Sequence, residues 1–440
     1  MNALATPVSL AWRLARHERR DTALPTMLSI TAFAVTTAAI LVTLGGVGAF
    51  ESRAVHSSAA GHLGQVYLVL AYTAAVLLVV PILTLGSVAV RLTVSRRDAR
   101  LATLRLVGAT NGQVTVMTLA EQAVQAAVGA VAGAALYGVL LVPLSSLSFQ
   151  GRHLSVAELW VGPLELLLVM LGVIVLAVLA GVSGLARVVV GPLGVVARTT
   201  PARLSIVRVL VAAAVVAVWV LGFTALGEQG MGVALGFLAL VVLMVNVVGP
   251  FLVMVAGHIV AWFARTPATL LAARRIVDDP KATWRSVSAL ALGILVAALS
   301  SVGPMIASGD ASEAEIRVLG EDIGTGSLVA LTILTVVAAT STGVVHAARV
   351  YDQRPQYRAL AYAGAPLPLL HRARLREVTI PVLVTVALGA TFPLLILLPL
   401  TALIGIGLVV RTVVAVAVAC ALLVAAVLAS RTLVDAAARL

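Results

Sequence analysis

Residues that could carry out chemistry are few in this chain, and their spacing matches no catalytic or nucleotide-binding pattern. The only lysine, Lys281, stands between Pro280 and Ala282, whereas a phosphate-binding loop has the form Gly-x-x-x-x-Gly-Lys-Ser/Thr. The seven histidines lack metal-ligand spacing, and Cys420 is alone inside an apolar run, so no disulfide or cysteine-based metal site is expected. We therefore expect a protein that is not an enzyme, binds no cofactor or metal itself, and needs a separate subunit for any ATP-driven work.

Ionisable residues of the apolar segments lie near the segment ends. Charged groups are costly inside a membrane, so a charge in the middle of a helix indicates an ion or proton path. Glu121, Glu165, Glu377, Arg91 and Arg411 instead lie where a side chain can reach the interface. A proton-coupled secondary carrier is therefore the least favoured transport mechanism.

Uncharged polar residues and prolines within the apolar segments leave two interpretations open. Asn246, Thr340 and Thr342 could form hydrogen bonds between helices, which is the favoured interpretation, or they could line a substrate path. Pro81 removes a backbone donor and should kink its helix. Such a kink would be either a hinge or only part of the shape of the helix.

The elements that must position these residues are membrane spans. Of the 440 residues, 61% are hydrophobic and 11% are charged, and the mean hydropathy is +1.10, whereas a soluble domain has about 25% charged residues. The apolar residues form blocks of about 20, the length of helix that crosses about 30 Å of hydrocarbon. We predict an all-α polytopic protein of a bacterial cytoplasmic membrane, with no nucleic-acid partner despite a net charge of +12.

Ten apolar segments are predicted to cross the lipid bilayer, and the basic residues orient them. With a cytoplasmic N-terminus, 26 of the 30 Lys and Arg residues fall on the cytoplasmic side, as the positive-inside rule requires, and both termini are then cytoplasmic. The longest outer loop, 307–325, is acidic and is expected to be a solvated amphipathic helix or a rim that attracts cationic ligands. The ten segments are 27–50, 66–90, 119–146, 163–186, 206–226, 231–257, 286–307, 326–348, 377–398 and 412–430.

Two parts of the sequence repeat at an offset of 256 residues. The stretch from Leu104 to Thr110 aligns with that from Leu360 to Pro366, and 13 residues after the glycine of each copy stands an acid, Glu121 or Glu377. Both copies run from a basic segment into a span, so the repeat is parallel and predicts a 4+2+4 arrangement of spans. The predicted parts are a cytoplasmic lead-in (1–26), a first repeat (27–200), a two-span insert (201–262), a second lead-in (263–285) and a second repeat (286–440).

Each copy of the repeat opens with a basic segment. Ser95 to Gly108 places leucines beside arginines, and its glycine suits a helix end or a tight turn. One such segment is usually a membrane-surface element. Two at equivalent positions on the cytoplasmic face indicate docking sites for two copies of a cytoplasmic partner.

The run from Arg96 to Gln113, with Glu121 downstream, resembles the signature of FtsX-like (MacB-type, type VII) ABC transporter permeases, in which a basic run, an (I/L)LRxxGA core and a later Glu form the coupling segment. The run from Arg354 to Glu377 resembles a divergent second copy, and 271–283 looks like the lead-in to the second half of ten-span, two-repeat members. The resemblance implies an ATPase-coupling role for Arg96, Arg97, Arg100, Leu104, Arg105, Gly108, Ala109, Glu121, Arg354, Arg358, Leu360, Gly364, Ala365 and Glu377.

The resemblance also implies partners and a substrate class. Cytoplasmic P-loop ATPases, two copies per permease chain, would bind ATP and Mg²⁺, and the permease would export or extract an amphipathic or hydrophobic substrate such as a peptide antibiotic, a lipid or a drug. A second hypothesis is a mechanical transmitter that controls an extracytoplasmic partner such as a cell-wall hydrolase. Many relatives carry a large extracytoplasmic domain, whereas the corresponding loops here have about 15–18 residues, which disfavours this second hypothesis.

Overall fold

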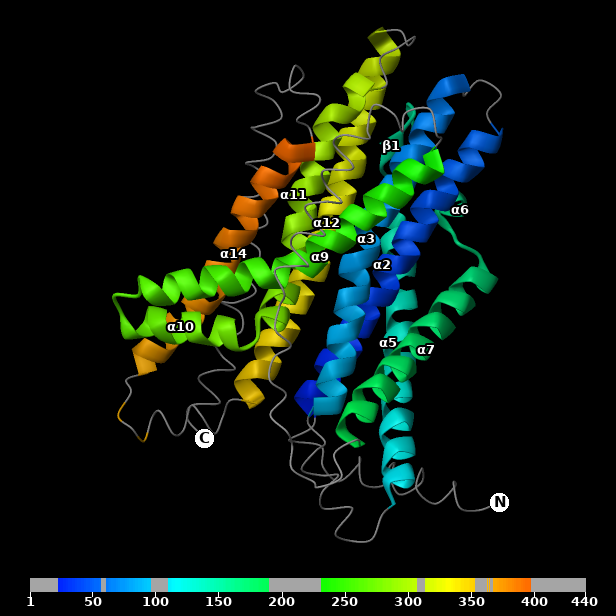
Figure 1. Ribbon diagram of the computed structural model, residues 1–440. Helices are drawn as coiled ribbons and strands as arrows, with labels where there is room; N and C mark the ends of the chain where they lie inside the picture. The colour runs from blue at the N-terminus through cyan, green and yellow to red at the C-terminus, as the bar shows by residue number, and fades with distance from the viewer. Residues whose placement is uncertain are drawn as a thin grey trace, which may run out of the picture. The chain divides into compact units, whose positions relative to one another are not determined.

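The computed structural model describes residues 23–56, 61–95, 110–189, 231–306, 313–352, 362, 364 and 367–396. Most of this part is helical, because a helix satisfies its backbone groups internally where water is absent. Its helices, drawn in Figure 1, are α2 (Ala23–His56), α3 (Gly61–Ser95), α5 (Asn111–Ser145), α6 (Val156–Leu159), α7 (Pro163–Val189), α9 (Met231–Trp262), α10 (Pro267–Asp278), α11 (Pro280–Ile306), α12 (Glu313–Asp352) and α14 (Leu367–Ile396).

Six stretches of these helices are long and apolar enough to cross a membrane, which confirms the predicted all-α polytopic class. They are Thr26–Val55, Gly64–Val90, Thr115–Ser145, Val156–Val182, Val242–Trp262 and Arg317–Val345. The predicted spans 206–226 and 412–430 lie outside the described residues. The count of ten spans and their orientation therefore stay predictions.

One small departure from the all-α prediction is a β-hairpin between α5 and α6. Strand β1 (Ser148–Phe149) pairs antiparallel with β2 (Arg152–His153), with Phe149 opposite Arg152. The two connecting residues, Gln150 and Gly151, have φ of 57° and 73°. Positive φ at both positions gives the tight turn that matches the twist of paired strands.

Helix boundaries recur at nearly the offset of the sequence repeat. Helix α5 begins at Asn111, and α14 begins 256 residues later at Leu367. Helix α3 ends at Ser95, and α12 ends 257 residues later at Asp352. These positions support the internal repeat, while the domain boundaries drawn from it stay predictions.

The chain forms two compact units. The first comprises 1–42, 82–142 and 160–199, and the second comprises 43–81, 143–159 and 200–440. In the first unit, α5 lies so close to α2 that a Cβ at Gly129 or Gly133 would clash with Phe33 or with the backbone of Ala34. This Gly-x-x-x-Gly spacing is typical of helices that pack closely in membranes.

In the second unit, α11 packs against α9, α12 and α14, and α10 packs against α9 and α14 (Figure 1). The indole of Trp284, on α11, is buried and lies where a Cβ at Gly249 of α9 would be. Leu292 of α11 and Leu334 of α12 are also buried. The second half of the chain therefore has its own packed core around α11.

Two sequence expectations concern the course of these helices. The acidic loop 307–325 is expected from the sequence to contain an amphipathic helix. Residues 313–325 are helical, and they form the first part of α12 without a break. Pro81 lies within α3, which continues to Ser95. The proline therefore does not end the helix.

Candidate functional site

The structure describes three of the fourteen predicted coupling residues: Glu121, Gly364 and Glu377. Glu121 lies on α5 and Glu377 on α14, each ten residues after the first residue of its helix. The other predicted coupling residues lie outside the described part of the chain: Arg96, Arg97, Arg100, Leu104, Arg105, Gly108, Ala109, Arg354, Arg358, Leu360 and Ala365.

In the first copy, a capping box begins the helix that follows the motif. The Thr110 backbone N–H donates to Oε1 of Gln113 over 3.0 Å, and the Gln113 backbone N–H donates to Oγ1 of Thr110 over 3.3 Å. Such a reciprocal pair satisfies donors that a helix start leaves free. Gly108-Ala109-Thr110 thus leads directly into α5, and Glu121 lies half-buried on that helix.

In the second copy, Gly364 has φ of +83°, a conformation that glycine adopts without steric cost. This φ agrees with the expected turn before the second helix of the motif. Position 366, equivalent to Thr110, is a proline. The second copy therefore lacks the side-chain cap of the first, and its turn depends on Gly364.

Glu377 forms a buried ion pair with the predicted lead-in segment. Its Oε2 lies 3.6 Å from Nη1 of Arg275 on α10, and the two side chains are only 5% and 9% exposed. The neighbouring Arg376 donates from Nη1 to Oγ1 of Thr269 over 2.5 Å and also to Oγ1 of Thr266. Residues 376–377 of the coupling segment thus hold α10, and we call these contacts the α10 clamp.

Helix α10 is also joined by hydrogen bonds to the next helix, α11. Asp279 ends α10, and its Oδ1 accepts a hydrogen bond of 3.0 Å from the backbone N–H of Ala282 in α11. The carbonyl of Asp279 also accepts from the backbone N–H of Thr283 over 3.1 Å. A displacement of α14 would therefore reach α11 through α10 as well as by direct packing.

The polar residues predicted for a substrate path or hinge make contacts between helices. Asn246 accepts a 3.2 Å hydrogen bond at Oδ1 from the indole N–H of Trp284. Thr342 is buried and donates from Oγ1 to the carbonyl of Ser286 over 2.7 Å. Thr340 is half-buried on α12. In this structure Asn246 and Thr342 connect α9 and α12 to α11, while a role of these residues in a substrate path stays a prediction.

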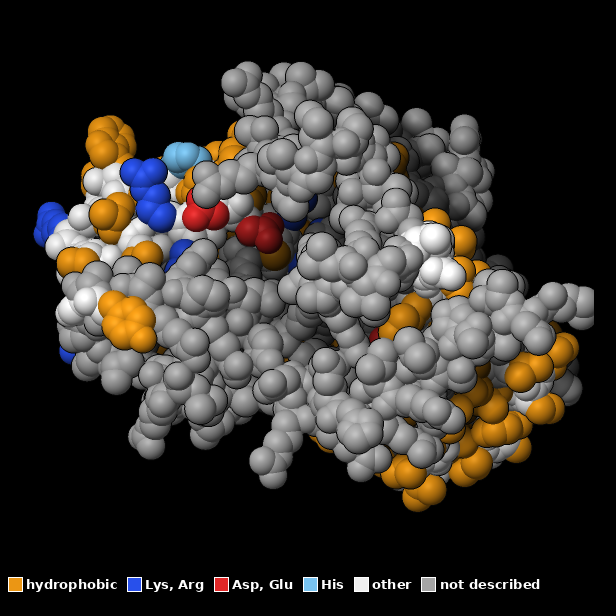
Figure 2. All heavy atoms as spheres, turned by 90° about the horizontal axis from the view of Figure 1, so that it is seen from below, with side chains coloured by type: hydrophobic (Ala, Val, Ile, Leu, Met, Phe, Trp, Pro, Cys, Tyr) orange, Lys and Arg blue, Asp and Glu red, His pale blue; other side chains and the backbone are white. Residues whose placement is uncertain are grey.

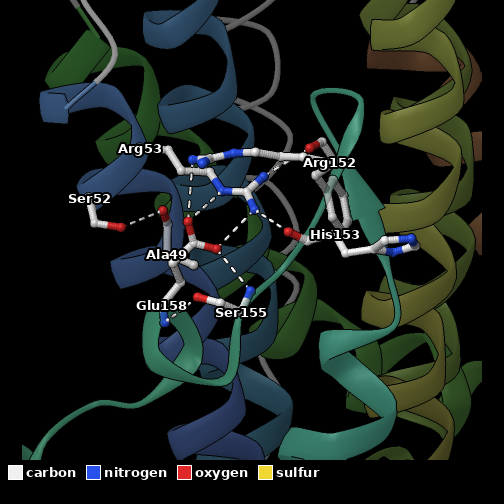
Figure 3. Close-up of polar contacts among 8 residues, drawn as sticks. Ala49, Ser52, Arg53, Arg152, His153, Ser155 and Glu158 are labelled. Atoms are coloured by element: carbon white, nitrogen blue, oxygen red, sulfur yellow. Dashed lines mark hydrogen bonds and ion pairs between the residues drawn. The ribbon is translucent and has the colours of Figure 1, made fainter.

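Sequence reasoning missed a polar cluster near the end of α2, on the side that the predicted topology makes extracytoplasmic; we call this cluster the outer clasp (Figure 3). Arg53 of α2 is 1% exposed, and its guanidinium donates to both carboxylate oxygens of Glu158, over 3.3 and 2.9 Å. It also donates to the carbonyl of Phe149 over 2.9 Å and to that of His153 over 3.0 Å. One arginine thus attaches the hairpin and α6 to the end of α2.

The hairpin also contacts the second half of the chain. Oδ2 of Asp322, on α12, accepts from the Tyr67 hydroxyl over 2.5 Å and from the Gln150 backbone N–H over 2.7 Å. The Phe149 ring packs edge-on against Phe50, with centroids 5.3 Å apart. Asp322 is 7% exposed. The sequence suggested that the acidic loop is a solvated helix or a rim that attracts cationic ligands. Asp322 fits neither expectation, because its carboxylate is buried and bound to Tyr67 and Gln150.

A local signal for part of the outer clasp is present in the sequence. Ser155 and Glu158 have the spacing of a capping box, and the structure shows it: the Ser155 backbone N–H donates to Oε2 of Glu158 over 3.0 Å, and the Glu158 backbone N–H donates to Oγ of Ser155 over 3.1 Å. The partner of Arg53 had no such signal, because Glu158 is 105 residues away. From the sequence, Arg53 is only one of the four basic residues expected on the extracytoplasmic side.

Comparison with known proteins gives one family. Residues 74–190 match the family model described as FtsX-like permease C-terminal, a stretch that holds the first coupling motif, α5 and α7. No curated protein and no solved structure matches the chain significantly. Permeases of this family are transmembrane subunits of ABC transporters and work with cytoplasmic ATPases. Residues 74–190 therefore form an FtsX-like permease domain, and together with the long apolar helices this match supports a multi-pass protein of the cytoplasmic membrane that is a membrane subunit of an ABC transporter.

Proposed function

We propose that this permease couples ATP hydrolysis by two separate cytoplasmic ATPase subunits to the export or extraction of an amphipathic or hydrophobic substrate, such as a peptide antibiotic, a lipid or a drug. The ATPases bind ATP and Mg²⁺, and they dock on the basic segments 96–121 and 354–377. The ATP-driven movement of the ATPases is transmitted to the transmembrane helices through α5 and α14, which follow these segments.

The observation that carries this proposal is the α10 clamp. Glu377 and Arg376 lie at the end of the second docking segment, and both hold α10. Because α10 packs on α9 and is capped into α11, a force on the docking segment acts on three helices together. The Glu377–Arg275 pair is buried, and two opposite charges from which water is excluded attract each other more strongly than in solvent, so separating α14 from α10 is costly.

The substrate class is supported by where charges and apolar groups lie. Within the described residues, the charged side chains of the candidate spans lie toward their ends, as Arg53 and Asp322 do. The outward faces of the spans are apolar; on α7, Leu164, Leu171 and Leu179 are more than half exposed. A substrate that partitions into lipid can reach such faces without crossing a polar pore.

The test is the ATPase activity of the co-purified complex in lipid nanodiscs, with and without candidate amphipathic substrates. We expect stimulation by a substrate, and loss of that stimulation when Gly108 and Ala109 are replaced by bulky acidic residues. The matched control is an acidic substitution at Ala157, which is exposed on α6. Absence of any ATPase from the gently extracted protein would refute the proposal.

The alternative function, a mechanical transmitter for an extracytoplasmic partner, gains one observation from the structure. The outer loop after α5 is a hairpin and a helical turn fixed by Arg53, and it exposes Val156 and Trp160. A partner could contact this rigid surface. Replacing Val156 and Trp160 by serine should then abolish capture of that partner while substrate-stimulated ATPase activity stays normal; unchanged capture excludes this surface.

A further inference from the structure

An exposed apolar face continues from the end of α9 into α10. Val255, Ile259 and Trp262 follow one another at helical spacing on α9, and Trp262 and Phe263 are 84% and 70% exposed. Their rings pack together with centroids 5.4 Å apart. Leu270 on α10 is also exposed. We call residues 255–278 the elbow.

Basic side chains accompany this apolar face. Arg265 stands two residues after Phe263, and Arg274 lies on the exposed side of α10. Figure 2 shows basic, acidic and hydrophobic side chains and a histidine close together on one side of the molecule. The two acids that end α10, Asp278 and Asp279, are both exposed, and Oδ1 of Asp279 accepts the hydrogen bond from the Ala282 backbone N–H.

The opposite face of the elbow is fixed to the protein. Ala268, Ala272 and Ile276 of α10 are buried, and Gly257 of α9 lies so close to α10 that a Cβ there would be 2.9 Å from Val277. The α10 clamp holds the start of the helix. The aromatic and basic side chains are therefore presented outward by a rigid support.

We propose that the elbow is a binding surface for anionic phospholipid headgroups at the membrane interface. The candidate span Val242–Trp262 ends at the aromatic pair, which places these rings where hydrocarbon gives way to headgroups. Aromatic rings are enriched at that level, and a helix with an apolar face and basic residues lies in the same plane. Arg265 and Arg274 then contact the lipid phosphates.

A soluble ATPase is a poorer occupant of the same surface. The exposed ladder Val255, Ile259 and Trp262 continues the apolar surface of the span, so its neighbours are acyl chains and headgroups. A protein partner that approaches from water would need to displace lipid from two largely exposed aromatic rings. The inference concerns lipid alone and does not depend on the coupling proposal.

The first experiment counts phosphatidylglycerol and phosphatidylcholine molecules that the purified full-length chain retains in native mass spectrometry. R265Q/R274Q should lower the affinity for phosphatidylglycerol about fivefold for each arginine at low ionic strength, with phosphatidylcholine unchanged. The matched control is R152Q/R317Q, which removes two exposed arginines elsewhere. Equal retention by R265Q/R274Q and the wild type overturns the inference, and so does an equal loss in the control.

A second measurement does not depend on the arginine variants. A spin label on W262C, in a chain whose Cys420 is replaced by alanine, should be reached by oxygen dissolved in the lipid and shielded from an aqueous nickel complex. A label that only the nickel complex reaches overturns the inference. If R265Q/R274Q instead loses a co-purifying ATPase and keeps its phosphatidylglycerol, the surface serves the ATPase and the inference is wrong.

Discussion

At the scale of single residues, Arg53 and Arg152 show how burial decides the value of a charge. Both contact Glu158, over 2.9 and 3.3 Å, but Arg53 is 1% exposed and Arg152 is 59% exposed. Arg53 also satisfies two backbone carbonyls of the hairpin. The same carboxylate therefore has one structural partner and one peripheral partner.

We predict that R53Q destabilises the protein far more than R152Q. Removing Arg53 leaves Glu158 and two carbonyls poorly compensated, at a cost of about 3 kcal/mol, whereas an exposed ion pair contributes about 0–1 kcal/mol. Thermal unfolding in detergent measures both, and hydrogen exchange should show a loosened hairpin in R53Q alone. Equal shifts in unfolding temperature for the two variants would contradict the structural role of the outer clasp.

Glu377 offers a second comparison at this scale. E377Q removes the buried ion pair between Glu377 and Arg275, so we expect a loss of about 3 kcal/mol in stability and weaker substrate stimulation of the associated ATPase. E165Q, at an exposed site on α7, is the matched control and should change neither. The double variant R275M/E377L should recover stability but not stimulation if the ion pair transmits force.

At the scale of elements, close helix approach depends on where glycine stands. A side chain at Gly133 would collide with Ala34 and Thr37 of α2, whereas Gly138, on the same helix, has no atom within 4 Å of an added Cβ. We predict that G133V sharply lowers the yield of folded protein and that G138V does not. Fluorescence-detected size-exclusion chromatography compares the two, and normal yield of G133V would refute the tight α2–α5 contact.

The capping box at the start of α5 is expected to contribute less to stability than the close contact between α2 and α5. T110A removes the side-chain acceptor of Gln113 N–H and should cost about 1 kcal/mol of helix stability. Because α5 follows the first coupling motif directly, we expect fraying of its first turn, measured by hydrogen exchange over 110–116. T110S keeps the hydroxyl and should behave as the wild type, so equal exchange in T110A and T110S would exclude the cap.

At the scale of the whole molecule, two of the passages between the compact units lie at prolines. The first unit resumes after Pro81 in α3 and is interrupted before Pro143 in α5, whereas α2 passes from one unit to the other between Val42 and Thr43 without a proline. Proline lacks a backbone donor and weakens a helix locally. Pro81, one of the residues that the sequence suggested as a hinge, therefore stands where α3 leaves one unit for the other.

We predict that P81A stiffens this junction and lowers substrate-stimulated ATPase activity several-fold, while the folded yield stays unchanged. P250A is the matched control, because Pro250 is also inside a helix but lies within the second unit. Activity equal to that of P250A would show that Pro81 only shapes its helix.

The sequence by itself determined membrane residence, the absence of a P-loop, and the likeness of residues 74–190 to FtsX-like permeases, because these depend on local composition and on one continuous motif. Blocks of about 20 apolar residues have few alternatives to a membrane helix, and the glycine of the second motif copy indicated the turn now seen at Gly364. The offset of 256 also separates the first residues of α5 and α14, although the spans predicted there began later, at residues 119 and 377.

Tertiary structure alone decided which charges are buried and what holds them. Asp322 belonged to an acidic loop by sequence, yet it binds Tyr67, 255 residues away, and Glu377 pairs with Arg275 on another helix. Side chains so far apart leave no spacing pattern, because their meeting depends on how helices pack. Burial then gives a carboxylate its structural value, since a partner that excludes water interacts more strongly than one in solvent.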